Sequence, residues 1–392
     1  MRAYLDLLRM PGILRITAAQ LTARIPLGML SLAILLHVEA QSGSYALAGG
    51  VVALVSVGEA IAMPITSRLT GPLGAWPTLL AAAGLHCAAL LLLVVVPAEP
   101  WAMLALGVLI GASVPPLMPV VRALYPRLVP GDRLPALFAL DTTAQELIWI
   151  IGPVVATLLA AGVSTSASLI ASAVITVLGA VWFVSSPLLA DVVLPRSSAV
   201  FGKSLLHGTV ALAMVASFLL VASFMALEVG IVAHFDGAGV LAGVAIAVSS
   251  VGSLVGGLAL GHRRLGLAGV VGSLCIVAVG TGLAGVSGDL WLILLALFLS
   301  GLGFAPALAA IYVMVSAVVR EDAATEVFGF LNTASLVGGA LGTALAGVLS
   351  ESAGPTGAFA AATVLAVAAA LSPAVARLAG PVAGLTAVKD AG

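Results

Sequence analysis

Charged side chains are scarce in this sequence: Lys, Arg, Asp and Glu make up 8% of its 392 residues. A soluble protein typically carries about 25% charged residues, which form its polar surface. The net charge of −1 also leaves no basic surface for nucleic acid, so that class of partner is excluded. Because 62% of the residues are apolar, the sequence predicts a multi-pass membrane protein, not a cytosolic enzyme or a disordered chain.

Cysteine and histidine are also rare. Cys87 and Cys275 lie inside apolar segments and the five histidines are scattered, so we expect neither a disulfide nor a metal site. Residues 197–204 are one residue short of a phosphate-binding loop, and no strand pattern precedes them. We therefore expect no nucleotide and no cofactor.

Apolar runs long enough to cross a bilayer as helices, about 20 residues each, recur twelve times along the chain. No segment alternates polar and apolar residues as a membrane barrel requires. The sequence therefore predicts an all-α membrane protein with twelve spans, at 14–36, 45–67, 77–96, 100–122, 135–161, 164–188, 205–231, 239–261, 266–286, 290–319, 324–350 and 355–378.

The basic residues predict how these spans are oriented. Every lysine and arginine except Arg24 falls at a terminus or in a connection on one side of the twelve-span arrangement. Connections rich in Lys and Arg face the cytoplasm. We therefore expect a protein of the cell (inner or plasma) membrane with both termini in the cytoplasm.

The second half of the chain repeats the first. At an offset of 194, residues 47–49 and Gly58 recur as 241–243 and Gly252, and at an offset of 190, Pro116 and Gly152 recur as Pro306 and Gly342. The repeat predicts two parallel six-helix halves with the substrate path between them. The expected divisions are a first half at 1–188, a cytoplasmic linker at 189–204, a second half at 205–378 and a cytoplasmic tail at 379–392.

Two motifs carry a resemblance to a known family. Residues 67–77 lie where the major facilitator superfamily has its loop motif between helices 2 and 3; Leu69 and Gly74 fit it, and the acidic and paired basic positions do not. Gly152 and Pro153 are similar to the Gly-Pro motif of the family's proton-coupled exporters. The sequence thus resembles a bacterial efflux-type branch of this superfamily. The resemblance implies a monomer that works by alternating access, with Arg68 in the gate.

Charges inside the first two spans are candidates for function, because each costs several kcal/mol to place there. Arg24 lies at the centre of the first span with Gln20 on the same face, and Glu59 lies near the centre of the second. We expect Arg24 and Glu59 to pair. The pair either fixes two helices, or Glu59 carries a proton and its protonation frees Arg24 to bind an anionic or polar substrate.

The fifth span holds Asp141, Gln145, Glu146 and Trp149. An acid beside an aromatic ring suits an amphipathic cation, so Glu146, Gln145 and Trp149 are candidates for substrate binding and proton exchange. The alternative for Glu146 is a hydrogen-bonded structural acid. Asp141 lies nearer the cytoplasm, where Arg122 ends the fourth span, so this pair is either a structural or gating contact or part of the proton path.

Two residues of the eleventh span complete the candidates. Asn332 either contacts substrate or bonds across helices, and Glu326 is expected to cap a solvated turn.

Together the residues predict a secondary transporter that exports a small organic compound in exchange for protons, with the proton gradient as its energy source. Uptake of a nutrient by proton symport uses the same parts. A membrane enzyme or scaffold is disfavoured, because no catalytic group of Ser, His and Cys is evident. The expected partners are the lipid bilayer and a small-molecule substrate.

Overall fold

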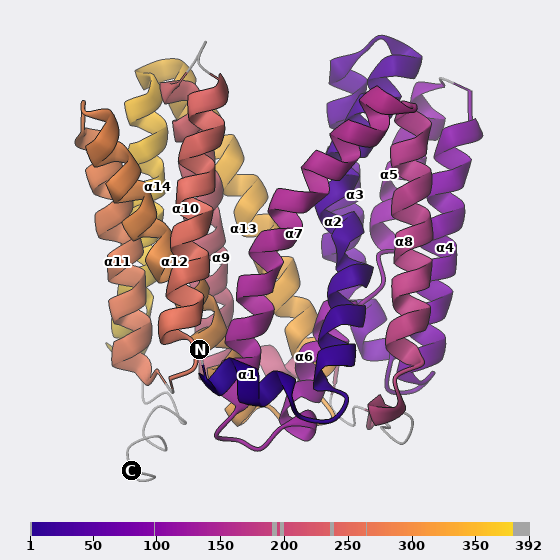
Figure 1. Ribbon diagram of the computed structural model, residues 1–392, viewed down its shortest axis with the longest axis horizontal. Coiled ribbons are helices and arrows are strands. Elements are labelled where there is room, and N and C mark those ends of the chain that lie inside the picture. Colours follow the sequence, from indigo (N-terminus) through magenta and orange to yellow (C-terminus); the bar gives the residue numbers. More distant parts are fainter. Residues whose placement is uncertain are drawn as a thin grey trace.

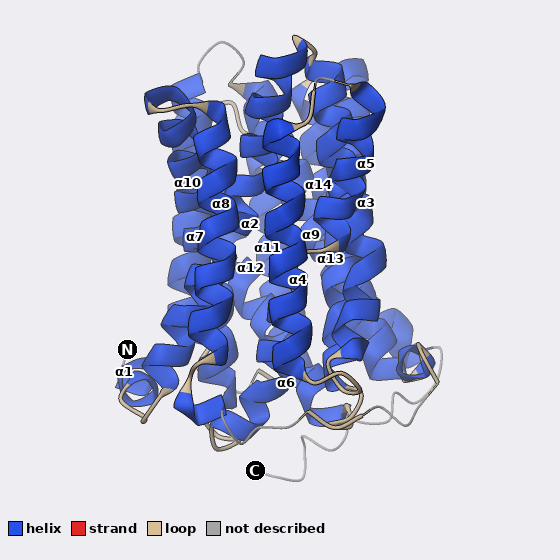
Figure 2. Ribbon diagram, turned by 90° about the vertical axis from the view of Figure 1, so that its right-hand side faces the viewer, coloured by secondary structure: helices blue, strands red, loops and turns tan. Residues whose placement is uncertain are grey.

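The protein is built from helices (Figure 2). The computed structural model describes residues 2–97, 99–189, 194–196, 200–235, 239–263 and 265–378, and no strand occurs in them. The predicted tail at 379–392 and parts of the predicted linker lie outside the described residues. The helices are α1 (Arg2–Leu8), α2 (Ile13–Ser42), α3 (Tyr45–Leu69), α4 (Ala75–Val95), α5 (Pro100–Ala112), α6 (Leu117–Leu128), α7 (Leu134–Gly162), α8 (Thr165–Val184), α9 (Gly208–His234), α10 (Gly239–Leu260), α11 (Leu267–Val286), α12 (Leu290–Val318), α13 (Ala324–Ala353) and α14 (Pro355–Leu378), with 3-10 turns at Pro187–Leu189 and Lys203–Leu206.

Twelve segments of the described chain are long and apolar enough to cross a membrane, which confirms the predicted number of spans. The fourth span is not the single helix that the sequence predicts over 100–122. Its helix breaks at residues 113–116, between α5 and α6, and continues to Leu128. Pro115 and Pro116 are adjacent, and each lacks a backbone N–H and disfavours helical geometry in the residue before it. Pro306, the repeat partner of Pro116, has no proline beside it, and α12 runs through it unbroken.

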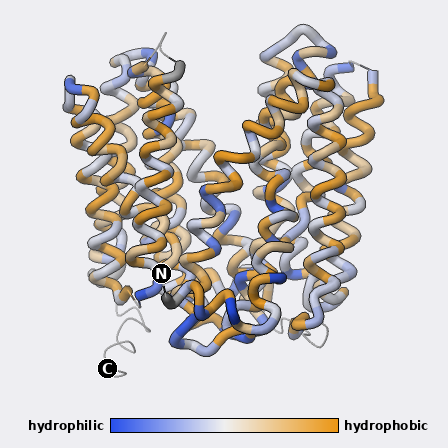
Figure 3. Tube along the Cα trace, in the orientation of Figure 1, coloured by the Kyte–Doolittle hydropathy of each residue, from blue (hydrophilic) through white to orange (hydrophobic). Residues whose placement is uncertain are grey.

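The helices form two groups, as the repeat predicts. Helices α2–α8 pack on one another, as do α9–α14, and the groups meet where α3 and α6 contact α13 and where α7 contacts α10 and α12. In Figure 1 the groups converge at the end where α1 lies and diverge toward the other end. We call the end with α1 the terminus side. Hydrophilic residues gather at this end and along the inner helices, whereas the outer helices are mainly hydrophobic (Figure 3).

Equivalent glycine contacts show the repeat in three dimensions. A Cβ atom on Gly58 of α3 would collide with the carbonyl oxygen of Val108 in α5, and one on Gly252 of α10 would collide with that of Phe298 in α12. The two glycines differ by the offset of 194, and the two carbonyls by the offset of 190. Small residues at these positions allow both pairs of helices to approach closely.

A close crossing of α2 and α7 positions the polar residues of the first group. A Cβ atom on Gly28 would collide with the backbone of Ile148, and one on Gly152 would collide with the backbone of Gly28. Because the backbones touch here, the side chains one or two turns nearer the terminus side also face each other across the two helices.

We expect Gly152→Ala to destabilise the protein by about 1–3 kcal/mol, because the added methyl group forces α2 and α7 apart. Gly162→Ala is the matched control in the same helix, since nothing lies within 4 Å of the Cβ position there. Thermal unfolding of both purified variants checks the prediction, and equal melting temperatures would contradict it.

Candidate functional site

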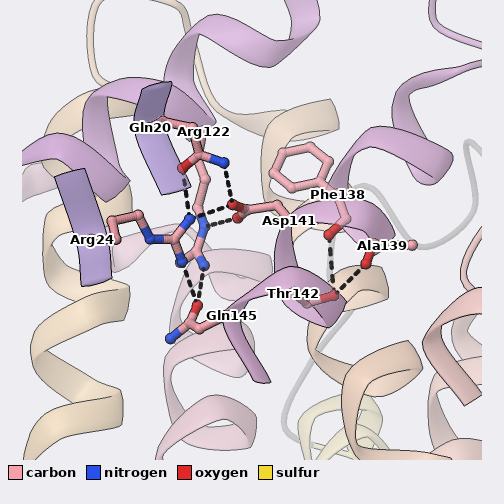
Figure 4. Close-up of polar contacts among 8 residues, drawn as sticks. All are labelled: Gln20, Arg24, Arg122, Phe138, Ala139, Asp141, Thr142 and Gln145. Carbon is pink, nitrogen blue, oxygen red and sulfur yellow. Dashed lines mark hydrogen bonds and ion pairs between the residues drawn. The ribbon is translucent and has the colours of Figure 1, made fainter. Parts of the chain in front are cut away.

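A buried ionic network joins α2, α6 and α7 (Figure 4). The carboxylate of Asp141 accepts a hydrogen bond at 2.5 Å from Nη1 of Arg24, and another at 3.0 Å from Nε of Arg122. All three side chains are 1% exposed. One carboxylate therefore holds two guanidinium groups, and the ionic pairs of this site carry an excess of positive charge.

Two glutamines complete the network. The Arg24 guanidinium donates to Gln20 Oε1 at 2.7 Å and to Gln145 Oε1 at 2.7 Å. Arg122 Nη2 also donates to Gln145 Oε1, at 3.3 Å, and Gln20 Nε2 donates to Asp141 Oδ1 at 3.3 Å. Gln20 and Arg24 are four residues apart, as are Asp141 and Gln145, so each pair shares a helix face. The crossing of α2 and α7 brings these two faces together.

Glu59 does not form the expected ion pair with Arg24, although both lie in the described part of the chain. Asp141 takes the guanidinium of Arg24, and Glu59 Oε1 instead accepts a hydrogen bond at 3.3 Å from Nδ2 of Asn332. This bond runs from α3 to α13 and joins the two groups of helices, as does the one at 2.8 Å from Thr333 Oγ1 to the carbonyl of Ala60.

A pocket lies beside the network at the break between α5 and α6. Its space, including the part that is open to solvent, is about 580 Å³, and Arg24, Glu59, His86 and Asn332 are among the residues that line it. Arg24 and Glu59 therefore border the same space without pairing. The sequence does not indicate that a ligand site lies here, at the break between α5 and α6.

Glu146 lies in the contact between α7 and α10. Its carboxylate accepts a hydrogen bond from Ser253 Oγ at 3.1 Å, its side chain is 6% exposed, and no ion pair of the described residues includes it. Trp149 lies one turn further along α7, on the face that carries Gln145, and is 52% exposed. No local pattern in the sequence points to Ser253 as the hydrogen-bond partner of Glu146.

Ion pairs close the terminus side between the two groups. Arg68 Nη1 of α3 contacts Glu326 Oε2 of α13 at 2.7 Å, and the backbone N–H of Gly202 donates to Glu326 Oε1 at 2.8 Å. Arg127 and Glu321 form a second pair across the groups, at 2.5 Å. Glu326 is 3% exposed, so the expectation that it caps a solvated turn is wrong: it is buried because Arg68 compensates its charge.

Aromatic rings pack beside these ion pairs. The Arg122 guanidinium carbon lies 4.0 Å from the centroid of the Tyr312 ring in α12, a cation–π contact between the two groups. Phe138 of α7 packs against Phe328 of α13, with centroids 6.1 Å apart. From the sequence, Tyr312 either lines the cavity or packs among apolar helices, and nothing in its own segment points to Arg122.

The short helix α1, which the sequence does not predict, also reaches across to the second group. The Tyr4 hydroxyl donates to the backbone carbonyl of Gly257 in α10 at 2.7 Å, and its ring meets that of His262 edge to face. Burial raises the pKa of Tyr4 to about 12. The hydroxyl therefore keeps its proton near neutral pH and remains a hydrogen-bond donor.

Loss of the Arg68–Glu326 pair should favour opening of the terminus side. In Arg68→Gln the buried Glu326 loses a charge-assisted bond worth about 1.5–3 kcal/mol, which shifts the balance of conformations by roughly tenfold or more. Electron–electron distance measurements between spin labels at the terminus-side ends of α3 and α13 should show a longer population. Arg320→Gln is the control, because Arg320 pairs with Asp322 within one group. An unchanged distance distribution in Arg68→Gln would contradict the prediction.

Solved structures share this fold. The chain superposes with a TM-score of 0.76 on a bacterial homologue of the iron transporter ferroportin in an outward-facing state, at 13% identity, covering 93% of this chain and 98% of that one. It superposes on the E. coli fucose:proton symporter FucP with a TM-score of 0.73 at 18% identity, covering 95% of this chain and 99% of that one. On the human organic anion transporter MFSD10 (TETRAN) the TM-score is 0.71 at 16% identity, covering 93% of this chain and 100% of that one.

Sequence comparison gives the family directly. No curated protein sequence matches the chain. The family model described as Major Facilitator Superfamily matches residues 16–276 and 205–387, which together span most of the sequence. Together with the twelve spans and the two groups of helices, this match shows that the chain belongs to the Major Facilitator Superfamily.

Proposed function

We propose that this membrane transporter couples the movement of a small organic compound to the movement of protons. The observation that carries the proposal is the position of Glu146. Its carboxylate lies where α7 of one group contacts α10 of the other, with a serine hydroxyl as its hydrogen-bond donor. A buried carboxylate without a cation partner favours the protonated form, and one that meets water ionises. Alternating access changes water access at such a contact, so Glu146 can release and take up a proton in each cycle.

Glu59 is the second candidate proton carrier. Its bond to Asn332 also crosses between the groups, and it borders the same pocket as Arg24. Asp141 differs from both, because two guanidinium groups occupy its carboxylate. We assign to Asp141 the role of holding Arg24 and Arg122 in place. By positioning Arg122, Asp141 also maintains the contact of Arg122 with Tyr312 in the gate.

The substrate contacts that we propose are polar groups around the pocket and the network. Arg24 and Asn332 line the pocket, and Gln20 and Gln145 orient the Arg24 guanidinium. Trp149 offers an exposed ring one turn beyond Gln145. Arg68 and Arg122 act in the gate, through Glu326 and Tyr312.

We propose export by exchange with protons, with a cytoplasmic terminus side. The distribution of Lys and Arg supports this orientation, and the Gly-Pro pair of α7 supports export by its similarity to the motif of proton-coupled exporters. Proton symport for uptake uses the same residues, so the direction of proton movement separates the two alternatives.

Proteoliposomes that contain a pH-sensitive dye test the proposal. A panel of labelled organic cations and carboxylates is added under an imposed proton gradient, and both substrate movement and internal pH are recorded. Exchange predicts that protons and substrate move in opposite directions; symport predicts the same direction. A substrate that is transported without any change of internal pH would refute proton coupling.

A further inference from the structure

The buried network on α2, α6 and α7 has one positive charge more than its ion pairs neutralise. Arg24 and Arg122 share the carboxylate of Asp141, and no other acid of the described residues forms an ion pair with either. The Nε atom of Arg24 is also buried without a hydrogen-bond partner among the described residues. A buried charge without a counter-ion is costly. The network therefore lacks one negative charge and one acceptor for Arg24.

The pocket beside Arg24 has a second feature that attracts an anion. Leu117 and Met118, the first two residues of α6, line it together with Arg24. A helix N-terminus carries the positive end of the helix dipole. In α6 the N–H of Leu117 donates to the carbonyl of Pro115 and Pro119 has no N–H, so Met118 supplies the one N–H of the first three residues that can face an anion. The break after α5 places this end inside the protein, so a guanidinium group and a helix N-terminus face the same space.

The rest of the pocket wall indicates the kind of anion. Most of the residues that line the pocket are apolar. A small inorganic ion would leave most of the apolar wall unfilled, whereas an organic body joined to a charged group would cover it. That wall includes Pro26, Leu27, Leu30, Met63, Leu79 and Val114.

We propose that this pocket binds the carboxylate group of a small organic anion, with Arg24 as its cationic partner. The inference rests on the proposed function, because the anion would be the transported compound. Arg24 lines the pocket and its Nε atom has no acceptor among the described residues, and the anion would supply both an acceptor for Arg24 and the missing negative charge.

Glu59 links this binding to a proton. The charged or titratable groups that share the pocket with Glu59 are Arg24 of α2 and His86 of α4; α13 contributes the neutral Asn332, and α5 has no titratable side chain. An ionised Glu59 would repel a carboxylate in the same space, whereas a protonated one would not. Protonation of Glu59 therefore favours binding of the anion, and for an anionic substrate this supports proton symport, the alternative to exchange given above.

Binding to the purified full-length protein in lipid nanodiscs tests the proposal. The probes are butyrate, benzoate and naphthoate, each compared with its uncharged amide by calorimetric titration. We expect at least one carboxylate to bind about tenfold or more tightly than its amide, the effect of one charge-assisted hydrogen bond. It should also bind more tightly at about pH 6 than at about pH 8, and Glu59→Gln should remove this difference.

Substitutions in α2 connect the effect to the pocket. Arg24→Gln should weaken carboxylate binding by about tenfold or more, and it leaves Asp141 paired with Arg122. Arg15→Gln is the matched control, because Arg15 lies in the same helix and donates to the carbonyl of Ser185 at an exposed position. If Arg24→Gln does not fold, Arg24→Lys, which keeps the charge and lacks Nε, should bind the carboxylate more weakly than the native protein.

Two results would overturn the proposal: no carboxylate binds better than its amide, or binding is unaffected by substitution of Arg24. Failure of the proposed function has a different signature. Exchange of an organic cation for protons without carboxylate binding would refute the anion and leave proton coupling intact. Carboxylate binding without proton movement in proteoliposomes would refute the coupling and leave the pocket assignment intact.

Discussion

Asp141→Asn is expected to destabilise the protein by about 3–5 kcal/mol, the usual effect of removing one partner from a buried ion pair. The reason is that Asp141 accepts hydrogen bonds from both Arg24 and Arg122, whose side chains are 1% exposed. Without the carboxylate, two buried guanidinium groups lie close together with only neutral amide groups as hydrogen-bond partners. Thermal unfolding and the folded fraction on size-exclusion chromatography measure the loss.

Two comparisons separate charge from shape in this result. Asp289→Asn makes the same change where the side chain caps α12 by accepting from the N–H of Leu292 at 3.0 Å. Asparagine caps a helix as well as aspartate does, so a change within about 0.5 kcal/mol is expected there. The double variant Asp141→Asn with Arg122→Gln removes one of the unpaired charges and should recover part of the stability. An Asp141→Asn protein as stable as the native one would contradict this account of the network.

The twelve spans could be predicted from the sequence because a bilayer requires long apolar helices, and few other patterns satisfy it. The repeat could also be predicted from the sequence, because the equivalent close helix contacts need small residues at equivalent positions, such as Gly58 and Gly252. The break at Pro115 and Pro116 was not predicted, because a single proline such as Pro306 is accommodated within a helix. Two adjacent prolines were the available signal. Helix α1 has 7 residues, too few to give a pattern of its own.

The candidate residues could be chosen from the sequence, whereas their partners could not. Charge inside an apolar span indicated Arg24, Glu59, Asp141 and Glu146 without specifying which helices meet. The spacing of four between Gln20 and Arg24, and between Asp141 and Gln145, was a usable signal for facing pairs. Contacts such as Glu326 with Arg68 depend on how the two groups of helices pack, and no local pattern encodes that.

Glu146→Gln is expected to reduce substrate-linked proton movement by about tenfold or more while exchange of substrate for substrate continues. Glutamine has nearly the same volume as glutamate and its carbonyl oxygen can still accept from Ser253 Oγ, but it cannot release a proton. The contact between α7 and α10 is therefore retained, and only the titratable group is lost. Internal pH and substrate movement, recorded together in proteoliposomes, measure the two activities separately.

Substitution of other acids determines whether the effect belongs to this carboxyl group. Glu351→Gln, at an exposed position near the end of α13, should leave proton movement unchanged. Glu59→Gln tests the second candidate, since Glu59 also joins the two groups of helices through Asn332. If Glu146→Gln keeps full proton movement and Glu59→Gln loses it, the proton is carried beside Arg24 in the pocket, and the serine-bonded carboxylate of α7 is a structural acid. If both variants lose it, each turnover needs both carboxyl groups, because both bonds must break when the helix groups separate at the terminus side.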